Sequence, residues 1–226
     1  MKKYLLAAAA AALFAASPAA AAGFKGVVVG KSGGALAVAT PTGVVHTIHG
    51  TARVGAVVLV SGKHVAVLGF AHRAVLRGVV VRRVGSTQFL AAGGTLLAVH
   101  GRARTVAAVG DSGPTPGTVV QDTVNVSSNG TLTQQSSQTI GQASNVSVQA
   151  TVTSIGTGTV TISVNGQPLT LPLPAGLTLP SSIVGSQVTL SVNLAGGTPT
   201  ATSADEGDGD NNDNQGDNNN HDNGND

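Results

Sequence analysis

The sequence predicts an all-β protein made of several small units. Val, Thr and Gly dominate the chain after residue 22, and these residues favour strands and tight turns. Apolar residues there do not follow the 3.6-residue period of a helix, but form short runs separated by Gly, Pro and Asn. Two groups of sequence landmarks also recur at nearly the same spacing, which indicates an internal repeat.

The first 22 residues predict a cleaved secretory signal peptide. Two lysines near the start precede an apolar core from Leu5 to Ala16, and Ala20–Ala22 forms a small-residue cleavage site. The apolar core is too short to span a bilayer, which needs about 20 residues. We therefore expect Gly23 to be the first mature residue, export to the periplasm or the medium, and no transmembrane segment in the mature chain. The chain has no Cys and forms no disulfides.

The internal repeat joins three regions. FKGVVVGKS at 24–32 matches LRGVVVRRV at 76–84, and HGTAR at 49–53 matches HGRAR at 100–104. A third, more diverged copy has Val-Gly-Ser-Gln-Val at 184–188, which matches the Val-Gly-x-x-Val that closes the first unit. In the second unit, a looser match to the same motif is Gly117-Thr118-Val119-Val120.

Each unit is expected to contain about five short strands, which is typical of a small closed or half-open barrel such as the OB-fold. Several strands of the first two units are apolar on both faces, which indicates that the units pack on one another. Asn165-Gly166 between alternating runs is a strong hairpin signal. The expected strands are 26–31, 35–40, 43–48, 54–60 and 64–69 in the first unit, and 146–154, 158–164, 168–173 and 185–193 in the third.

This pattern resembles a known family. It consists of Gly-x-Val, then a hairpin with alternating apolar residues, and then Val-Gly-x-x-Val-x-Val. This order is similar to the OB-like β-barrel repeats of an uncharacterised family of exported bacterial proteins. That family is a domain of unknown function found in tandem behind a signal peptide. The resemblance covers 23–72 and 146–194 well and 74–126 less well. It implies an OB-like fold and a location in the cell envelope, and it carries no catalytic residues.

The sequence thus divides into six segments. The region 127–145, rich in Ser, Gln and Asn, is a connector or an irregular strand pair, and residues 205–226 contain no aliphatic or aromatic side chain, so we expect an acidic tail that is disordered, with 198–204 as its linker. The segments are the signal peptide 1–22, a basic β unit 23–73, a second basic β unit 74–126 with a turn-rich insertion at 110–117, the connector 127–145, a neutral β unit 146–196, and the Asp/Asn/Gly-rich tail 197–226.

Charge is arranged in blocks, and this is the strongest functional signal. Every Lys and Arg after the signal peptide lies in 25–104, which we call the basic segment. The basic segment contains no Asp or Glu, whereas the chain from residue 105 on contains Asp and Glu but no Lys or Arg. Such a segment attracts polyanions, although its basic residues are equally typical of solvated strand faces. The candidate anion-binding residues are Arg53, Arg77, Arg82, Arg83, Arg102 and Arg104, followed by Lys25, Lys31 and Lys63.

Gly30-Lys31-Ser32 resembles the end of a phosphate-binding loop, but its context predicts a β-hairpin. The preceding Gly26 makes the loop one residue too short for G-x-x-x-x-G-K-[ST]. Gly33-Gly34 then turns the chain into another strand, whereas a phosphate loop leads into a helix. The second unit has Arg82-Arg83-Val84 at the equivalent place.

Neither a metal site nor a catalytic site is predicted. His46 and His49 are three residues apart on an expected strand, so they point to opposite faces. The basic segment has five His and no carboxylate to orient them, and a Ser-His-Asp triad would need Asp111 or Asp122. The tail at 208–212 begins like a calcium-binding loop but lacks the later Gly and Glu, which leaves loose divalent-metal binding as its only metal chemistry.

The sequence therefore favours a non-catalytic exported binding or structural module of the bacterial cell envelope or exterior, without a cofactor. One alternative is a polyanion or nucleic-acid binder that uses the basic segment, with the acidic tail as a competitor. A second alternative is a divalent-metal-binding tail on an inert scaffold. The expected partners are anionic polymers or envelope components, and self-association through pairing of the basic and acidic blocks is a further expectation. The mature chain has only three Phe and no Tyr or Trp, which disfavours nucleic acid because base stacking needs aromatic side chains.

Overall fold

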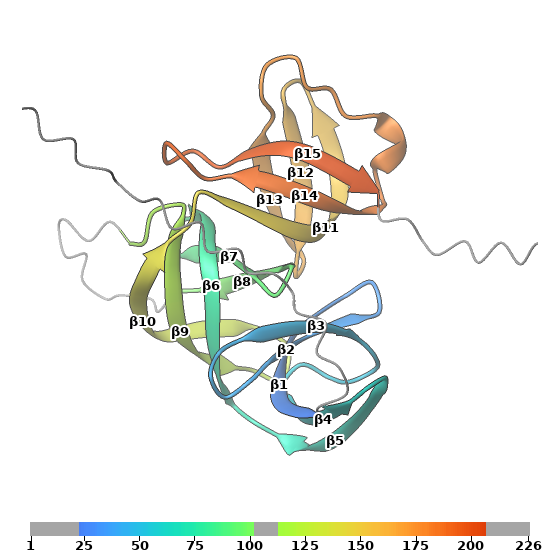
Figure 1. The fold of residues 1–226 in the computed structure, drawn as a ribbon, viewed down its shortest axis with the longest axis vertical. Coiled ribbons are helices and arrows are strands. Elements are labelled where there is room, and N and C mark those ends of the chain that lie inside the picture. Colours follow the sequence, from blue (N-terminus) through green and yellow to red (C-terminus); the bar gives the residue numbers. More distant parts are fainter. Residues whose placement is uncertain (1–22, 102–112, 207–226) are drawn as a thin grey trace, which may run out of the picture.

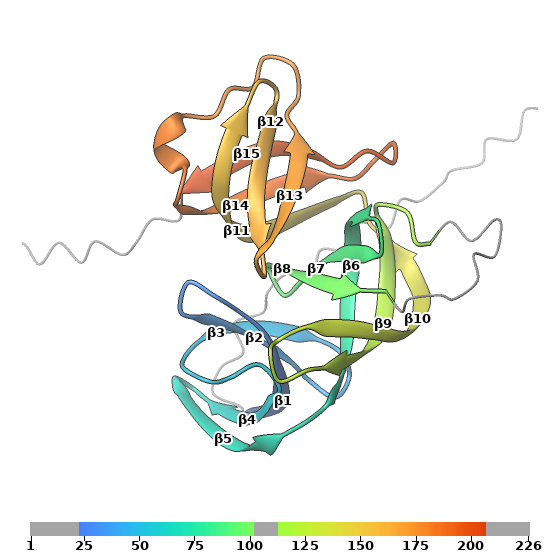
Figure 2. The same ribbon diagram turned by 180° about the vertical axis from the view of Figure 1, so that it is seen from behind.

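The computed structural model describes residues 23–101 and 113–206. Fifteen β-strands and one short 3₁₀ turn at Ser181–Ile183 (η1) make up its regular structure, which confirms the all-β fold class. The strands form three small barrels in sequence order, and Figures 1 and 2 show the second barrel between the first and the third. The expected signal peptide and most of the expected tail lie outside the described residues.

Barrel one is a five-stranded antiparallel sheet with the order β3-β2-β1-β4-β5. No pairing joins β3 to β5 in the described chain, so this barrel is half open. The five strands agree with the sequence-predicted ones to within two residues at each end. They are β1 (Phe24–Ser32), β2 (Ala35–Ala39), β3 (Val45–His49), β4 (Ala56–Ser61) and β5 (His64–Phe70).

Barrel two repeats this order and is closed. Its third and fifth strands pair in parallel, with Leu132 opposite Val99 and Thr133 opposite His100. In a five-stranded OB barrel the two outer strands pair in parallel, and all other neighbouring strands pair antiparallel, which is the arrangement seen here. Its strands are β6 (Arg73–Val84), β7 (Thr87–Ala92), β8 (Thr95–His100), β9 (Thr118–Val126) and β10 (Leu132–Gln142).

Barrel three has the same order, β13-β12-β11-β14-β15. It continues the sheet of barrel two, because Gln149 of β11 pairs in parallel with Thr95 of β8. Its strands are β11 (Asn145–Gly156), β12 (Thr159–Val164), β13 (Gln167–Pro172), β14 (Gln187–Asn193) and β15 (Thr200–Glu206).

An equivalent glycine precedes the fourth strand of each barrel. The backbone N–H groups of Gly55, Gly117 and Gly185 donate to the carbonyls of Val28, Val80 and Val152, at 2.7, 2.8 and 2.8 Å. All three have a φ between +86° and +91°, which favours glycine. The loose sequence match at Gly117 and the diverged copy at Gly185 are therefore structurally equivalent to Gly55.

The first strand of each barrel also bends at the same place. A register shift separates Val28 from Gly30 in β1, Val80 from Arg82 in β6 and Val152 from Ser154 in β11. Such bulges increase the local twist, which helps a short sheet to curl into a barrel.

The repeated Val-Val-Val run is buried on both faces. In β6, Val80 points into barrel two, whereas Val79 and Val81 pack with the interior of barrel three. In β1, Val28 lies in the core of barrel one, while Val29 packs with the interior of barrel two. The outer face of each of the first two barrels thus covers the interior of the next barrel along the chain.

Two strands lie where the sequence did not indicate regular ones. β10 occupies most of 127–145, for which a connector and an irregular strand pair were both left open, and it completes barrel two. β15 (Thr200–Glu206) lies beyond the expected end of the third unit at 196, so the expectation of a linker at 198–204 and of disorder from 205 was wrong for these residues. Both strands are rich in Ser, Thr, Gln or acids. An edge strand pairs through its backbone and needs few apolar side chains, which is why composition alone did not reveal them.

Gly26 in β1 and Gly78 in β6 lie where neighbouring strands approach closely. A Cβ at Gly26 would lie 2.6 Å from the carbonyl oxygen of Ala39, and one at Gly78 would lie 2.8 Å from that of Ala91. We expect Gly78→Ala to lower the free energy of unfolding by about 1–3 kcal/mol, because the strands must move apart. Thermal unfolding followed by circular dichroism measures this loss.

Gly141 in β10 is the matched control, since a Cβ there makes only ordinary contact, 3.7 Å from Val119. Equal melting temperatures for Gly78→Ala and Gly141→Ala would contradict the close-approach argument.

Candidate anion-binding groove

The structure distributes the nine candidate basic residues over two barrels. Lys25, Lys31, Arg53, Lys63, Arg77 and Arg83 are exposed, Arg82 is half-buried, and Arg102 and Arg104 lie outside the described residues. Barrel one carries Lys25 and Lys31 on β1, Arg53 on the β3–β4 loop and Lys63 on the β4–β5 turn, and barrel two carries Arg77, Arg82 and Arg83 on β6.

Arg82 and Arg83 are brought together at one groove. The groove lies between barrels two and three and has a volume of about 620 Å³, and none of the described residues that line it is acidic. Its walls come from the end of β6, the end of the turn-rich insertion, the last residue of β13 and the β14–β15 turn. The lining residues are Arg82, Arg83, Gly113, Pro114, Thr115, Pro116, Pro172, Gly197, Thr198 and Pro199.

Both arginines are held by backbone contacts. Arg82 Nη1 donates to the carbonyl of Thr170 in β13, which ties barrel two to barrel three, and Arg83 Nε donates to the carbonyl of Gly85 at 3.2 Å. A Cβ at Gly113 would lie 1.6 Å from Arg83 Nη1, so the guanidinium packs directly on a backbone that has no side chain. Each guanidinium has five N–H donors, and the hydrogen bond described above uses one donor of each arginine.

Arg77 has a different environment. Its Nε donates to Gln121 Oε1 on the neighbouring strand β9, at 2.9 Å, and it is not among the residues that line the groove. The remaining described candidates, all on barrel one, are also outside the groove. Sequence reasoning missed the prolines Pro172 and Pro199, because nothing in their local sequence links them to a site on β6.

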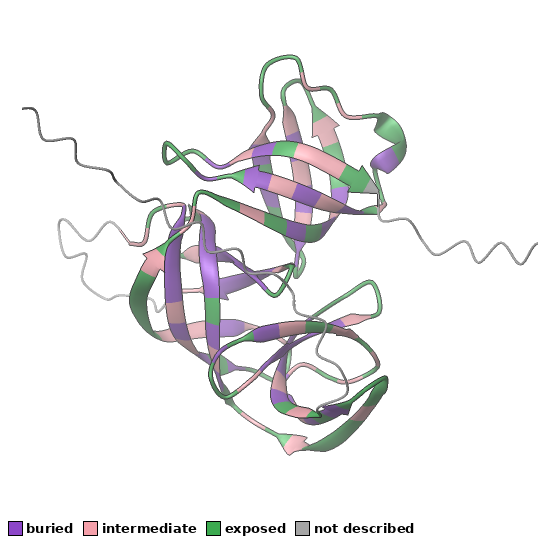
Figure 3. Cartoon of the chain, in the orientation of Figure 1, coloured by how far each residue is buried: buried purple, intermediate pink, exposed green. Residues whose placement is uncertain are grey.

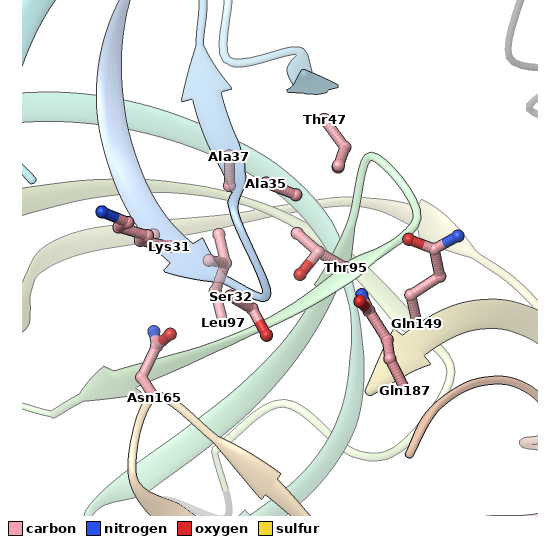
Figure 4. Close-up of a pocket in the computed structure, with 11 residues that line it drawn as sticks. Lys31, Ser32, Ala35, Ala37, Thr47, Thr95, Leu97, Gln149, Asn165 and Gln187 are labelled. Carbon is pink, nitrogen blue, oxygen red and sulfur yellow. The ribbon is translucent and has the colours of Figure 1, made fainter. Parts of the chain in front are cut away.

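Gly30-Lys31-Ser32 lies at the end of β1 in the β1–β2 hairpin, as the sequence predicted. Gly33 and Gly34 form its turn with φ of +54° and +81°, and a Cβ at Gly33 would lie 2.7 Å from Gln187 Oε1 in barrel three. Figure 4 shows the crevice where this hairpin meets Thr95 of barrel two and Gln187 of barrel three. Its volume is about 10 Å³, which is room for one water molecule and not for a phosphate group.

The histidines are dispersed. His46 in β3 packs against Phe24 with ring centroids 4.5 Å apart, and His100 Nδ1 lies 3.0 Å from Thr87 Oγ1. His49 and His100 end the third strands of barrels one and two. Within the described ranges, no three His, Asp or Glu side chains gather as metal ligands.

Asp122 in β9 is fully buried inside barrel two. Gln88 Nε2 donates to Asp122 Oδ2 at 3.2 Å, while Oδ1 has no partner in hydrogen-bonding geometry. Burial raises the pKa of this carboxyl group above its ordinary value of 3.8, and the side chains of Ser137 and Gln134 beside it oppose the shift by less. This acid has no access to a substrate in the groove.

Comparisons with known proteins add no family. No family model and no curated protein matches the sequence. Two solved structures align over most of the chain. A multidomain protein with nucleic acid binding domains from Streptococcus pneumoniae is 10% identical, with a TM-score of 0.24 over 80% of this chain and 72% of that one. Drosophila Unr CSD456 is 14% identical, with a TM-score of 0.20 over 82% and 97%. Such low TM-scores carry no argument, so the OB-like assignment depends on the strand pairing described above.

None of the helical structure in 23–101 and 113–206 is long and apolar enough to cross a bilayer.

The buried Asp122 makes stability depend on pH. Because its folded-state pKa is raised, its contribution is fully present below the ordinary value of 3.8 and is lost as pH rises through the folded-state pKa. We expect Asp122→Asn to melt at a higher temperature than the wild type at neutral pH, with the difference closing in acid. Melting temperatures measured from about pH 3 to pH 8 test this.

Asn125→Ser on the exposed face of the same strand is a change that does not titrate, so its effect should be the same at every pH. A constant difference between Asp122→Asn and the wild type across the range would show that the carboxyl group is not the cause.

Proposed function

We propose that this protein is an exported, non-catalytic module that binds an anionic polymer in the groove between barrels two and three. The observation that carries the proposal is the pairing of Arg82 and Arg83 at a groove of about 620 Å³ whose described lining residues include no acid. This refines the broader expectation of a binding or structural module to one surface.

The chemistry of the groove suits phosphate or carboxylate groups. A guanidinium presents a planar fork of donors that matches both anions, and it keeps its charge at all physiological pH values. The volume lies in the ordinary range of ligand sites, roughly 300–1,000 Å³. Proline side chains supply rigid walls, so little order is lost when a ligand binds.

The lining also indicates which part of a polymer would be contacted. No aromatic side chain is among the residues that line the groove, so stacking on bases or sugar rings is not available there. Contacts would therefore be made to the charged backbone. The exposed Lys25, Lys31, Arg53 and Lys63 on barrel one add a long-range attraction that salt screens.

The acidic end of the chain is proposed as a competitor for this groove. β15 ends at Glu206, and the residues after it include six Asp and no Lys or Arg. These carboxylates would compete with an external polyanion for the arginines. A truncation that tests this must end after Glu206, because an earlier end removes part of β15.

Export is proposed from the first 22 residues and agrees with the resemblance to an exported bacterial family. We expect the chain secreted by a bacterial host to begin at Gly23. Intact mass measurement of the secreted protein tests this, and a mass that retains residues 1–22 would contradict it.

Removal of one groove arginine should weaken polyanion binding. We expect Arg83→Gln to lower affinity for polyphosphate several-fold and to reduce the slope of log affinity against log salt by about 1, because one ionic contact is lost. Fluorescence anisotropy at low and moderate salt measures both quantities, with single-stranded oligonucleotide and polyglutamate as further probes. Arg83 is the better target, since Arg82 also joins the two barrels.

Arg73→Gln is the matched control, because Arg73 is exposed on the same strand but outside the groove. Equal losses in the two variants would show that only net charge matters. Absence of binding by both residues 23–226 and residues 23–206 would reject the proposal and favour a purely structural module.

A further inference from the structure

The fifth strand of barrel one differs from its two equivalents. Among the strands in 23–101 and 113–206, β5 is an edge strand that pairs with β4 alone. Val67, Leu68 and Phe70 on it are 51%, 55% and 66% exposed. Figure 3 shows the exposed colour along much of this strand, at the outer limit of the molecule.

The equivalent strands of the other barrels are mainly polar where they are exposed. The exposed part of β10 includes Ser136, Ser137, Gln138 and Thr139, with Ile140 as its one apolar exception, and β15 reads TATSADE. Polar and charged residues keep an open strand edge from pairing with other chains. From residue 64 to residue 70, β5 has neither an Asp, Glu, Lys or Arg nor a proline. An edge of this kind is a template for pairing with another strand.

Side chains on β5 lie on both faces of the sheet. Val67 and Phe70 are opposite Val58 and Ala56 of β4, so they share the inner face with these core residues, yet remain exposed at the open side of the barrel. Ala66 is opposite the exposed Leu59 on the outer face. A strand added beside β5 would cover both groups.

We propose that β5 pairs antiparallel with β5 of a second copy of this chain. A two-fold axis perpendicular to the sheet keeps each face on its own side, so Val67 and Phe70 of the two copies form one apolar cluster and Leu59 and Ala66 form another. The uncharged strand brings no repulsion to the pairing itself. Continuation of a sheet from one barrel into another already occurs within the chain, where β8 pairs in parallel with β11 at Thr95 and Gln149.

Net charge also permits two copies to approach. Without residues 1–22 the chain has ten Lys and Arg, which is twelve minus Lys2 and Lys3, and ten Asp and Glu. Association by apolar burial should therefore persist as salt is added. This separates the inference from the proposed function, because polyanion binding should weaken under the same conditions.

Sedimentation velocity of residues 23–226 over a range of concentrations tests the pairing. We expect a monomer–dimer equilibrium with a Kd in the micromolar range, since a single strand pair is a small interface. Val67→Lys and Phe70→Lys should each raise the Kd at least about tenfold, because a charge must be buried at the pair. Ile140→Lys on β10, which replaces a residue that is 44% exposed on the equivalent strand, should leave it unchanged.

Hydrogen exchange of the wild-type protein gives a second, variant-independent measurement. Edge amides of β5 should exchange more slowly at concentrations where the dimer forms. A wild-type chain that stays monomeric at its solubility limit would overturn the inference. So would a dimer that Ile140→Lys weakens as much as Val67→Lys does, or one in which β5 amides gain no protection.

Discussion

Burial of both faces of the first strand in barrels one and two determines how the molecule is assembled. A Val-Val-Val run places its central residue inside its own barrel and its neighbours against the next barrel. Separating the barrels would expose Val29, Val79 and Val81, and this apolar surface is unfavourable in water. The first strand of barrel three has Ser147, Gln149 and Thr151 between its buried residues, so the series ends there.

The groove exists because of this packing. Its lining comes from four separate parts of the chain that meet only when barrels two and three are in contact. Arg82 contributes directly, since its hydrogen bond to the Thr170 carbonyl crosses the junction. Gly113 leaves room for the guanidinium of Arg83. The arginines are thus positioned by the packing of the two barrels.

The three barrels share one strand order but differ at the fifth strand. β10 closes barrel two by pairing with β8, β15 is polar and acidic, and β5 is apolar and open. Because the fifth strand is paired along its length on one side only, its side chains are less constrained by the core than those of the first strand. Barrels with the same fold can therefore have fifth strands of different polarity, and these differences between the barrels lie at positions that face solvent.

The sequence by itself determined the all-β class, the five strands of the first unit, the first four strands of the third unit, and the hairpin role of Gly30-Lys31-Ser32. These features are local, because strand periodicity, turn glycines and the repeat are written in neighbouring residues. Only the tertiary structure decided that Arg82 and Arg83 meet at a groove while Lys25, Arg53 and Lys63 do not, that Asp122 is buried, and that β10 and β15 are strands. Proximity between distant segments depends on how the barrels pack, and backbone pairing at a sheet edge leaves little trace in side-chain composition.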